Sequence, residues 1–147
     1  MAPVGDTQPV DEETDRVHSF YNAMAPRYDQ IIAVAQRALS GDGRRWACTQ
    51  ASGDVFEVAV GTGRNIPYYP PGARLTGVDL SPAMLSRAQN RAAALNRPTE
   101  LRLGDAQHLE FPDATFDTVL AILTLCSIPT TTPRSPKWGA YCDPGAA

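Results

Sequence analysis

The chain has 147 residues, a formal net charge of −3 and a pI near 5.3, which suits one globular domain with no basic surface for nucleic acid. No apolar run approaches the ~20 residues that span a bilayer and no secretion signal opens the chain, so the sequence predicts a soluble cytoplasmic protein. The three cysteines, Cys48, Cys126 and Cys142, are scattered, which argues against a disulfide scaffold or a zinc site.

The N-terminal part of the chain predicts a leader followed by helices. Residues 1–14 are acidic, contain prolines and lack a hydrophobic period, which is typical of a disordered leader. From Asp15 to Leu39 apolar residues recur at helical spacing. Pro26 interrupts this stretch, so we expect two helices there. A short helix or turn over residues 44–50 follows.

The central part alternates strands and a helix. The predicted strands cover residues 55–60, 73–79, 99–105 and 116–125. The intervening helix begins at Ser81, a favoured N-cap, with proline at the first helical position. Its apolar stripe comprises Met84, Leu85, Ala88, Ala92 and Leu95. Apolar strands joined in this way are typical of a parallel sheet covered on both faces, so we expect a Rossmann-like, doubly wound α/β fold.

The stretch VFEVAVGTGRN, residues 55–65, runs from a buried-looking strand straight into a glycine turn. No Gly-Lys pair occurs in the chain, which excludes a P-loop. The turn contains Gly61 and Gly63 but lacks the third glycine of a dinucleotide fingerprint. Asp79 lies about 20 residues further on, where an acid can bind a ribose in several nucleoside-binding families, so it does not discriminate between them.

Three acids lie at or near the carboxyl ends of three predicted strands. Burying Glu57 costs ~2–7 kcal/mol or more unless its carboxylate is bonded or paired. We expect Glu57 to fix the loop's backbone and to face a cationic part of a ligand. Asp79 and Asp105 end the next two strands, so all three acids converge on one crevice. Such a crevice suits an ammonium, a ribose diol and an exocyclic amine better than phosphates.

These residues resemble the motifs of the class I S-adenosylmethionine-dependent methyltransferases. EVAVGTG, residues 57–63, resembles the first motif, an acid followed by G-x-G-x-G, with Ala59 where the first glycine usually stands. TGVDLSPAML, residues 76–85, resembles the second motif, and LGDAQHLEFPDATFDTVL, residues 103–120, the third and fourth. YNAMAPRYD, residues 21–29, is similar to the N-terminal helix of quinone C-methyltransferases and bacterial phosphatidylethanolamine N-methyltransferases.

The resemblance implies the strand order 3-2-1-4 and S-adenosylmethionine as the cofactor. It implies that Asp79 takes the ribose hydroxyls and that Leu80 packs on adenine. Asp105 and the backbone of Ala106 would lie at the adenine edge, and Tyr28 would approach the methionine carboxylate. The expected cofactor-binding residues are Tyr28, Glu57, Ala59, Gly61, Gly63, Asp79, Leu80, Met84, Asp105 and Ala106.

Several of these residues also have structural explanations, which the sequence leaves open. Asp79 and Asp105 can simply cap the element that follows, Tyr28 can be a core aromatic residue, and Met84 can belong only to the packing face of its helix. His108 can be a base or a solvated loop residue. Methyl transfer from a sulfonium needs alignment and the exclusion of water, so the sequence names no catalytic residue and no metal.

The resemblance ends at Pro129. Residues 130–147 are irregular, where the family continues with a helix and three more strands. If the codons permitted for this tail are read one base earlier, they can encode the peptide DDHPAQSEVGRVLRPGG. That peptide is similar to the sequence with which the family continues. We therefore expect a one-base frameshift near Pro129 and an incomplete methyltransferase domain over residues 15–129. The nucleotide sequence across Pro129 tests this hypothesis.

The predicted function is the cofactor half of a methyltransferase that acts on a small molecule or lipid. The alternatives are a non-catalytic remnant with weak or no nucleoside binding, and a fragment of a nicotinamide-dependent oxidoreductase. Without a fifth strand, residues 118–128 would form an exposed apolar sheet edge, which predicts dimerisation or aggregation.

Overall fold

The computed structural model describes residues 12–39 and 43–122. Its elements, in chain order, are α1 (Glu12–Leu39), α2 (Gly43–Thr49), β1 (Asp54–Val58), the 3-10 helix η1 (Ile66–Tyr68), β2 (Arg74–Asp79), α3 (Pro82–Ala94), β3 (Thr99–Leu103) and β4 (Thr118–Leu120). Most of the predicted leader and the whole of the predicted tail, together with Cys126 and Cys142, lie outside the described residues.

The four strands form one parallel sheet in the order β3-β2-β1-β4, which confirms the predicted fold class and strand order. In the register of the sheet, Val55 of β1 lies between Leu75 of β2 and Thr118 of β4. Asp79, the last residue of β2, pairs with Leu103, the last residue of β3. The carboxyl ends of the strands therefore meet at one edge of the sheet.

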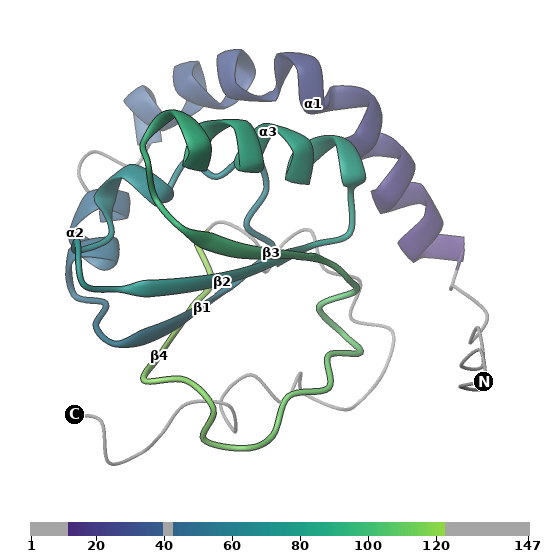
Figure 1. The fold of residues 1–147 in the computed structure, drawn as a ribbon. Helices are drawn as coiled ribbons and strands as arrows, with labels where there is room; N and C mark the ends of the chain where they lie inside the picture. The colour runs from purple at the N-terminus through teal and green to yellow at the C-terminus, as the bar shows by residue number, and fades with distance from the viewer. Residues whose placement is uncertain (1–11, 40–42, 123–147) are drawn as a thin grey trace.

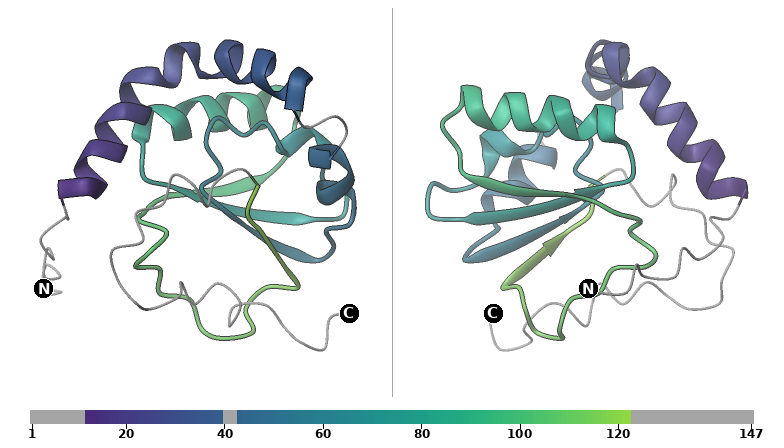
Figure 2. Two further views of the ribbon diagram at one scale, coloured as in Figure 1. Left: turned by 180° about the vertical axis from the view of Figure 1, so that it is seen from behind. Right: turned by 45° about the vertical axis from the view of Figure 1, so that its right-hand side comes forward.

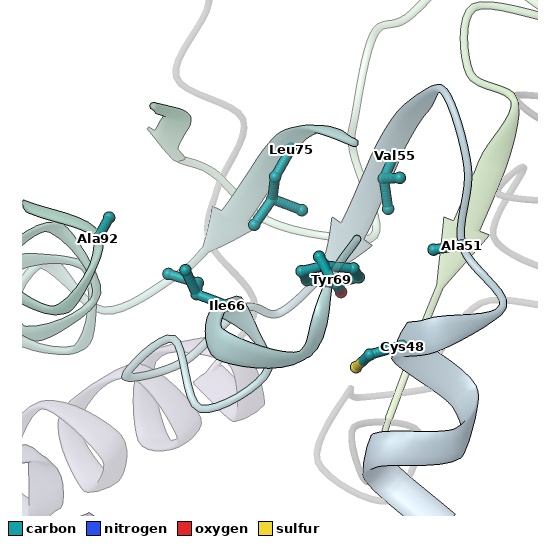
Figure 3. Packing of buried hydrophobic residues seen from close by; sticks show 7 residues of the cluster. All are labelled: Cys48, Ala51, Val55, Ile66, Tyr69, Leu75 and Ala92. Carbon is teal, nitrogen blue, oxygen red and sulfur yellow. The ribbon is translucent and has the colours of Figure 1, made fainter. Parts of the chain in front are cut away.

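The two faces of the sheet are covered differently (Figure 1). On one face, α3, α2 and η1 enclose a cluster that Figure 3 shows in close-up: Cys48, Ala51, Val55, Ile66, Tyr69, Leu75 and Ala92. On the other face, the segment between β3 and β4 packs its aromatic rings on β1. Phe56 contacts Phe111 and Phe116 with ring centroids 5.1 and 5.0 Å away, and the centroids of those two rings lie 5.1 Å from each other. Within the described residues, an aromatic loop rather than a helix covers this second face.

α3 matches its sequence prediction closely because its signals are local. Ser81 caps the helix, and its side-chain oxygen accepts a hydrogen bond from the Met84 N–H at 3.2 Å. The predicted stripe is buried except at Leu95, which is 42% exposed. Leu95 is the C-cap, and Asn96 follows in a left-handed conformation with φ 50°, so the helical face has already ended.

α1 is one helix where the sequence predicts two, and it begins at Glu12 rather than Asp15. Pro26 lies inside it, and the helix arches across α3 (Figure 2). The helix continues because it is anchored on both sides of the proline. Asn22 bonds to the Ala83 N–H, and Asp29 pairs with Arg91. None of the described helices is long and apolar enough to cross a membrane.

Candidate functional site

The candidate site lies where β1 ends and the glycine loop, residues 59–65, begins. Ala59, Gly61 and Gly63 all have left-handed backbones, with φ of 51°, 58° and 76°. Ala59 thus adopts the left-handed backbone conformation that favours glycine, at the position where the methyltransferase family that this chain resembles usually has glycine. A left-handed backbone costs a non-glycine residue about 1–2 kcal/mol, so this departure strains the loop but keeps its path.

Gly63 is where α3 packs closely against the loop. A Cβ atom at this position would lie 2.6 Å from Ile66 Cδ1 and 3.1 Å from Ala88 Cα. A Cβ atom on Gly61 would meet nothing within 4 Å. In a dinucleotide fingerprint, the third glycine allows the helix to pack closely. This chain lacks that glycine, and Gly63 allows the close packing of α3 instead. Gly61 leaves open space at the edge of the sheet.

Asp79 ties the glycine loop to the end of β2. Its Oδ2 accepts a hydrogen bond from the Gly61 N–H at 2.8 Å, and its Oδ1 accepts one from the Ser81 N–H at 2.9 Å. Burial raises the pKa of this carboxyl group, while the backbone N–H groups of Ser81, Gly61 and Leu80 oppose the rise. Each carboxylate oxygen has further acceptor capacity, so Asp79 can also accept bonds from a hydroxyl-bearing ligand.

Glu57 is buried, with 2% of its surface exposed. Its Oε1 accepts a bond from Asn65 Nδ2 at 2.5 Å, and its Oε2 accepts one from the Tyr69 hydroxyl at 2.7 Å. Burial raises the pKa of Glu57 to about 7, and these two bonds oppose the rise. Glu57 holds the loop through side chains rather than through the backbone as expected. The cation that acts on it here is Arg44, which also bonds to Asn65.

Tyr28 of α1 lies within reach of the charges of this site. Burial raises the pKa of its phenol, Tyr21 and Asp79 add to the rise, and Arg44 and Arg64 oppose it. The structure thus brings Tyr28, Asp79 and two guanidinium groups together from different parts of the chain. Burial lowers the pKa of Arg44, and the nearby charge of Arg64 lowers it further, since two cations share this end of the site.

Asp105 lies two residues beyond the end of β3. The Gly104 N–H donates to the Asp79 carbonyl at 3.0 Å, which joins the ends of β2 and β3 near the two predicted acids. Asp105 Oδ1 accepts a bond from the Gln107 N–H at 2.9 Å, so it also caps the local turn. Ala106 packs against the aromatic cluster, and His108 is exposed. Both the capping and the ligand-facing explanation of Asp105 fit this geometry.

The remaining predicted residues differ in their exposure. Leu80 is half-buried at the site, whereas Met84 is 1% exposed and packs in the core. Cys48 is a buried free thiol, and burial raises its pKa to about 11. The described residues contain no cluster of three or more histidines, cysteines or acids that could hold a metal ion.

Five polar residues that belong to the glycine loop, or contact it or Glu57, were not predicted from the sequence: Asp29, Arg44, Arg64, Asn65 and Tyr69. In a sequence, a polar residue in a helix or a loop cannot be distinguished from a residue on the solvated surface. The buried Glu57 was the one available signal, because a buried carboxylate needs partners. Which residues would supply them depends on the path of the loop, which the sequence does not give.

Known proteins are similar to this chain in sequence and in fold. A family profile described as a methyltransferase domain matches residues 56–135, which are 80 of the 147 residues. A phosphatidylethanolamine N-methyltransferase from Cereibacter sphaeroides is 44% identical over 79 residues, 52% of this chain and 39% of that protein. A demethylmenaquinone methyltransferase from Deinococcus radiodurans is 33% identical over 124 residues, 80% of this chain and 50% of that protein.

The fold is shared with magnesium protoporphyrin IX methyltransferase from Synechocystis PCC 6803, whose structure was solved with bound S-adenosylmethionine. The TM-score is 0.66 at 21% identity, and the match covers 84% of this chain and 68% of that one. The chain spans half or less of the length of the two sequence relatives.

Proposed function

This chain belongs to the class I S-adenosylmethionine-dependent methyltransferases, and on that premise we propose that its crevice binds S-adenosylmethionine for methyl transfer to a small molecule or lipid. The bond from the Gly61 N–H to Asp79 carries this proposal. It sets an acid with spare acceptor capacity beside a glycine loop that leaves open space, at the carboxyl edge of the sheet where ligands of such folds bind.

We assign the parts of the cofactor by their chemistry. Asp79 accepts the ribose hydroxyls, while Leu80 and the Asp105–Ala106 turn face the adenine. Arg44 and Arg64, together with the Tyr28 hydroxyl, face the methionine carboxylate, because this end of the crevice holds two guanidinium groups. Glu57 supports this end indirectly, since it holds Asn65, which in turn bonds to Arg44.

The acceptor is proposed from the relatives. Their names specify phosphatidylethanolamine and demethylmenaquinone, so we propose a lipid or quinone-like acceptor. When bound, S-adenosylmethionine would supply a methyl group already activated on its sulfonium sulfur, and a nitrogen or carbon acceptor would also have to lose a proton. The chain's own residues would hold the cofactor, align the acceptor atom with the methyl group and the sulfur, and exclude water. Transfer of a labelled methyl group from the cofactor to either lipid tests this step.

Isothermal titration of the purified chain with S-adenosylhomocysteine tests the cofactor assignment. We expect micromolar binding that Asp79→Asn weakens about tenfold or more, since a bond to a charged group contributes about 1.5–3 kcal/mol. Asp54→Asn is the matched control, because Asp54 is an acid at the opposite end of β1 that pairs with Arg74 on the surface.

Three results would contradict the proposal. They are no heat from folded protein, equal binding by the Asp79→Asn chain, and a preference for NADH, which would favour the oxidoreductase alternative. Binding without methyl transfer to any lipid would instead support the non-catalytic alternative.

A further inference from the structure

Asp29 joins three elements around the glycine loop. Its Oδ1 accepts a hydrogen bond from the Thr62 hydroxyl at 2.5 Å, and its Oδ2 pairs with Arg91 of α3. Its backbone carbonyl accepts a bond from Arg64 Nη1 at 2.9 Å, and the same guanidinium nitrogen lies 3.7 Å from Oδ1. One residue of α1 therefore holds the loop and the adjacent helix through its carboxylate, and Arg64 mainly through its backbone carbonyl.

Thr62 is well placed to transmit this contact. It lies between Gly61 and Gly63, and it is 1% exposed. Its two neighbours have left-handed backbones and no side chains to fix them. The loop is therefore held from the sheet by Asp79, which binds the Gly61 N–H, and from α1 by Asp29, which binds the Thr62 hydroxyl.

Most apolar side chains of α1 are half-buried or exposed rather than fully buried. Phe20, Ile31 and Val34 are 58%, 52% and 74% exposed, and Thr14 and Ala25 are its buried residues in the described part. Figure 2 shows the helix lying over α3 rather than on the sheet. The position of α1 therefore depends on polar contacts as well as on its half-buried apolar side chains. Of the polar contacts named above, those of Asp29 reach the glycine loop.

We propose that Asp29 is a positioning residue for the cofactor, which couples the docking of α1 to the conformation of the glycine loop. The inference rests on the proposed function of the crevice. Without the Asp29–Thr62 bond, the loop keeps its anchor on Asp79 and the bond from Arg64 to the Asp29 carbonyl, but the Gly61–Gly63 turn loses its direct contact with α1.

Three substitutions separate positioning from general stability. Asp29→Asn keeps the shape of the side chain but removes its negative charge. Its amide oxygen can accept from Arg91 only while its amide N–H donates to the Thr62 oxygen, so the charge-assisted bond from Thr62 is replaced by a weaker neutral one of the opposite direction. Thr62→Val removes the same bond from its other end. Thr62→Ser keeps the hydroxyl and is the conservative variant that should restore binding.

The experiment measures the Kd for S-adenosylhomocysteine by titration and the Tm by calorimetry. We expect Asp29→Asn and Thr62→Val each to weaken binding about tenfold, as one charge-assisted bond does. Thr62→Ser should stay within about twofold of the unmodified chain. The double variant Asp29→Asn with Thr62→Val should bind no more than about twofold more weakly than either single variant, because both remove the same bond.

Arg87→Ala is the control. It removes a bond from Arg87 Nη2 to the Pro26 carbonyl at 3.0 Å, an α1–α3 contact that does not involve the loop. We expect it to lower the Tm without changing the Kd.

Full affinity in Thr62→Val, losses that add in the double variant, or an equal loss of affinity in Arg87→Ala would each overturn the inference. If the unmodified chain binds no S-adenosylhomocysteine, the proposed function fails and the inference fails with it. If the unmodified chain binds and the variants bind equally well, the inference alone fails. Where Asp29→Asn does not fold, the comparison of Thr62→Val with Thr62→Ser decides.

Discussion

At the scale of single residues, Glu57 makes the stability of the chain depend on pH. Its pKa is about 7 in the folded protein, against an ordinary value of 4.5. The folded state therefore binds a proton more tightly than the unfolded state. The contribution of Glu57 to the free energy of unfolding is therefore greatest below pH 4.5, and it falls as the pH rises toward 7. The total change is on the order of 3 kcal/mol.

Glu57→Gln should remove most of this dependence. The amide that replaces the carboxyl group can still accept a bond from Asn65 and can donate one to the Tyr69 oxygen, so the buried network remains satisfied. We expect the free energy of unfolding in urea to become nearly flat between pH 5 and pH 8 and to exceed that of the unmodified chain at pH 8. Glu100→Gln, which changes an exposed acid in β3, serves as the control. An unchanged pH slope in Glu57→Gln would contradict the assignment.

The same residue marks how far the sequence could predict the site. Asp79 and Asp105 were predictable because strand ends in a parallel sheet converge, and the Gly104–Asp79 bond joins the ends of β2 and β3 as that rule requires. The partners of Glu57 were not predictable. Asn65 and Tyr69 reach it only because the loop folds back beneath β1, and a strand pattern carries no information about that path.

At the scale of elements, the two glycines of the glycine loop, Gly61 and Gly63, differ in how closely other atoms pack against them. Both have left-handed backbones, so an alanine at either position costs about 1–2 kcal/mol. Only the Cβ of an alanine at Gly63 would also collide with Ile66 and Ala88. Crowding of this kind typically costs about 1–3 kcal/mol more. Comparing an alanine at the two positions therefore separates the free-energy cost of backbone strain from that of crowded packing.

We therefore expect Gly63→Ala to destabilise the chain by about 2–5 kcal/mol and Gly61→Ala by about 1–2 kcal/mol. Urea unfolding of the two variants, measured at one pH, gives both values. Gly61→Ala is the matched control because it carries the same backbone cost in open space. Equal losses in the two variants would show that α3 does not pack on the loop as closely as the distances indicate.

α1 illustrates why the sequence prediction of elements succeeds in some places and fails in others. α3 and the strands were predicted because their caps, prolines and apolar runs are local signals. Pro26 is also a local signal, and it predicts a break. The structure overrides it because Asn22 and Asp29 bond to other elements on either side of the proline, at sequence separations of about 60 residues.

At the scale of the whole molecule, the two edges of the sheet differ in charge. β3 lies at one edge and exposes the pair Glu100 and Arg102. β4 lies at the other edge, and its three residues, Thr118–Leu120, carry no charge. In the part of the chain that the structure describes, β4 pairs only with β1. Charged side chains on an edge strand discourage pairing with another chain, and the β4 edge lacks them.

We therefore predict that the chain self-associates through β4. Sedimentation velocity over a hundredfold range of concentration should show a species larger than a monomer at the upper end. Ala121→Lys places a charge on the exposed residue directly after β4, so it should shift the distribution toward monomer. Ala94→Lys introduces the same charge on the exposed end of α3 and should leave the distribution unchanged. A monomer at every concentration would contradict the prediction, as would equal effects of the two lysines, because solubility would then depend on net charge rather than on the edge of the sheet.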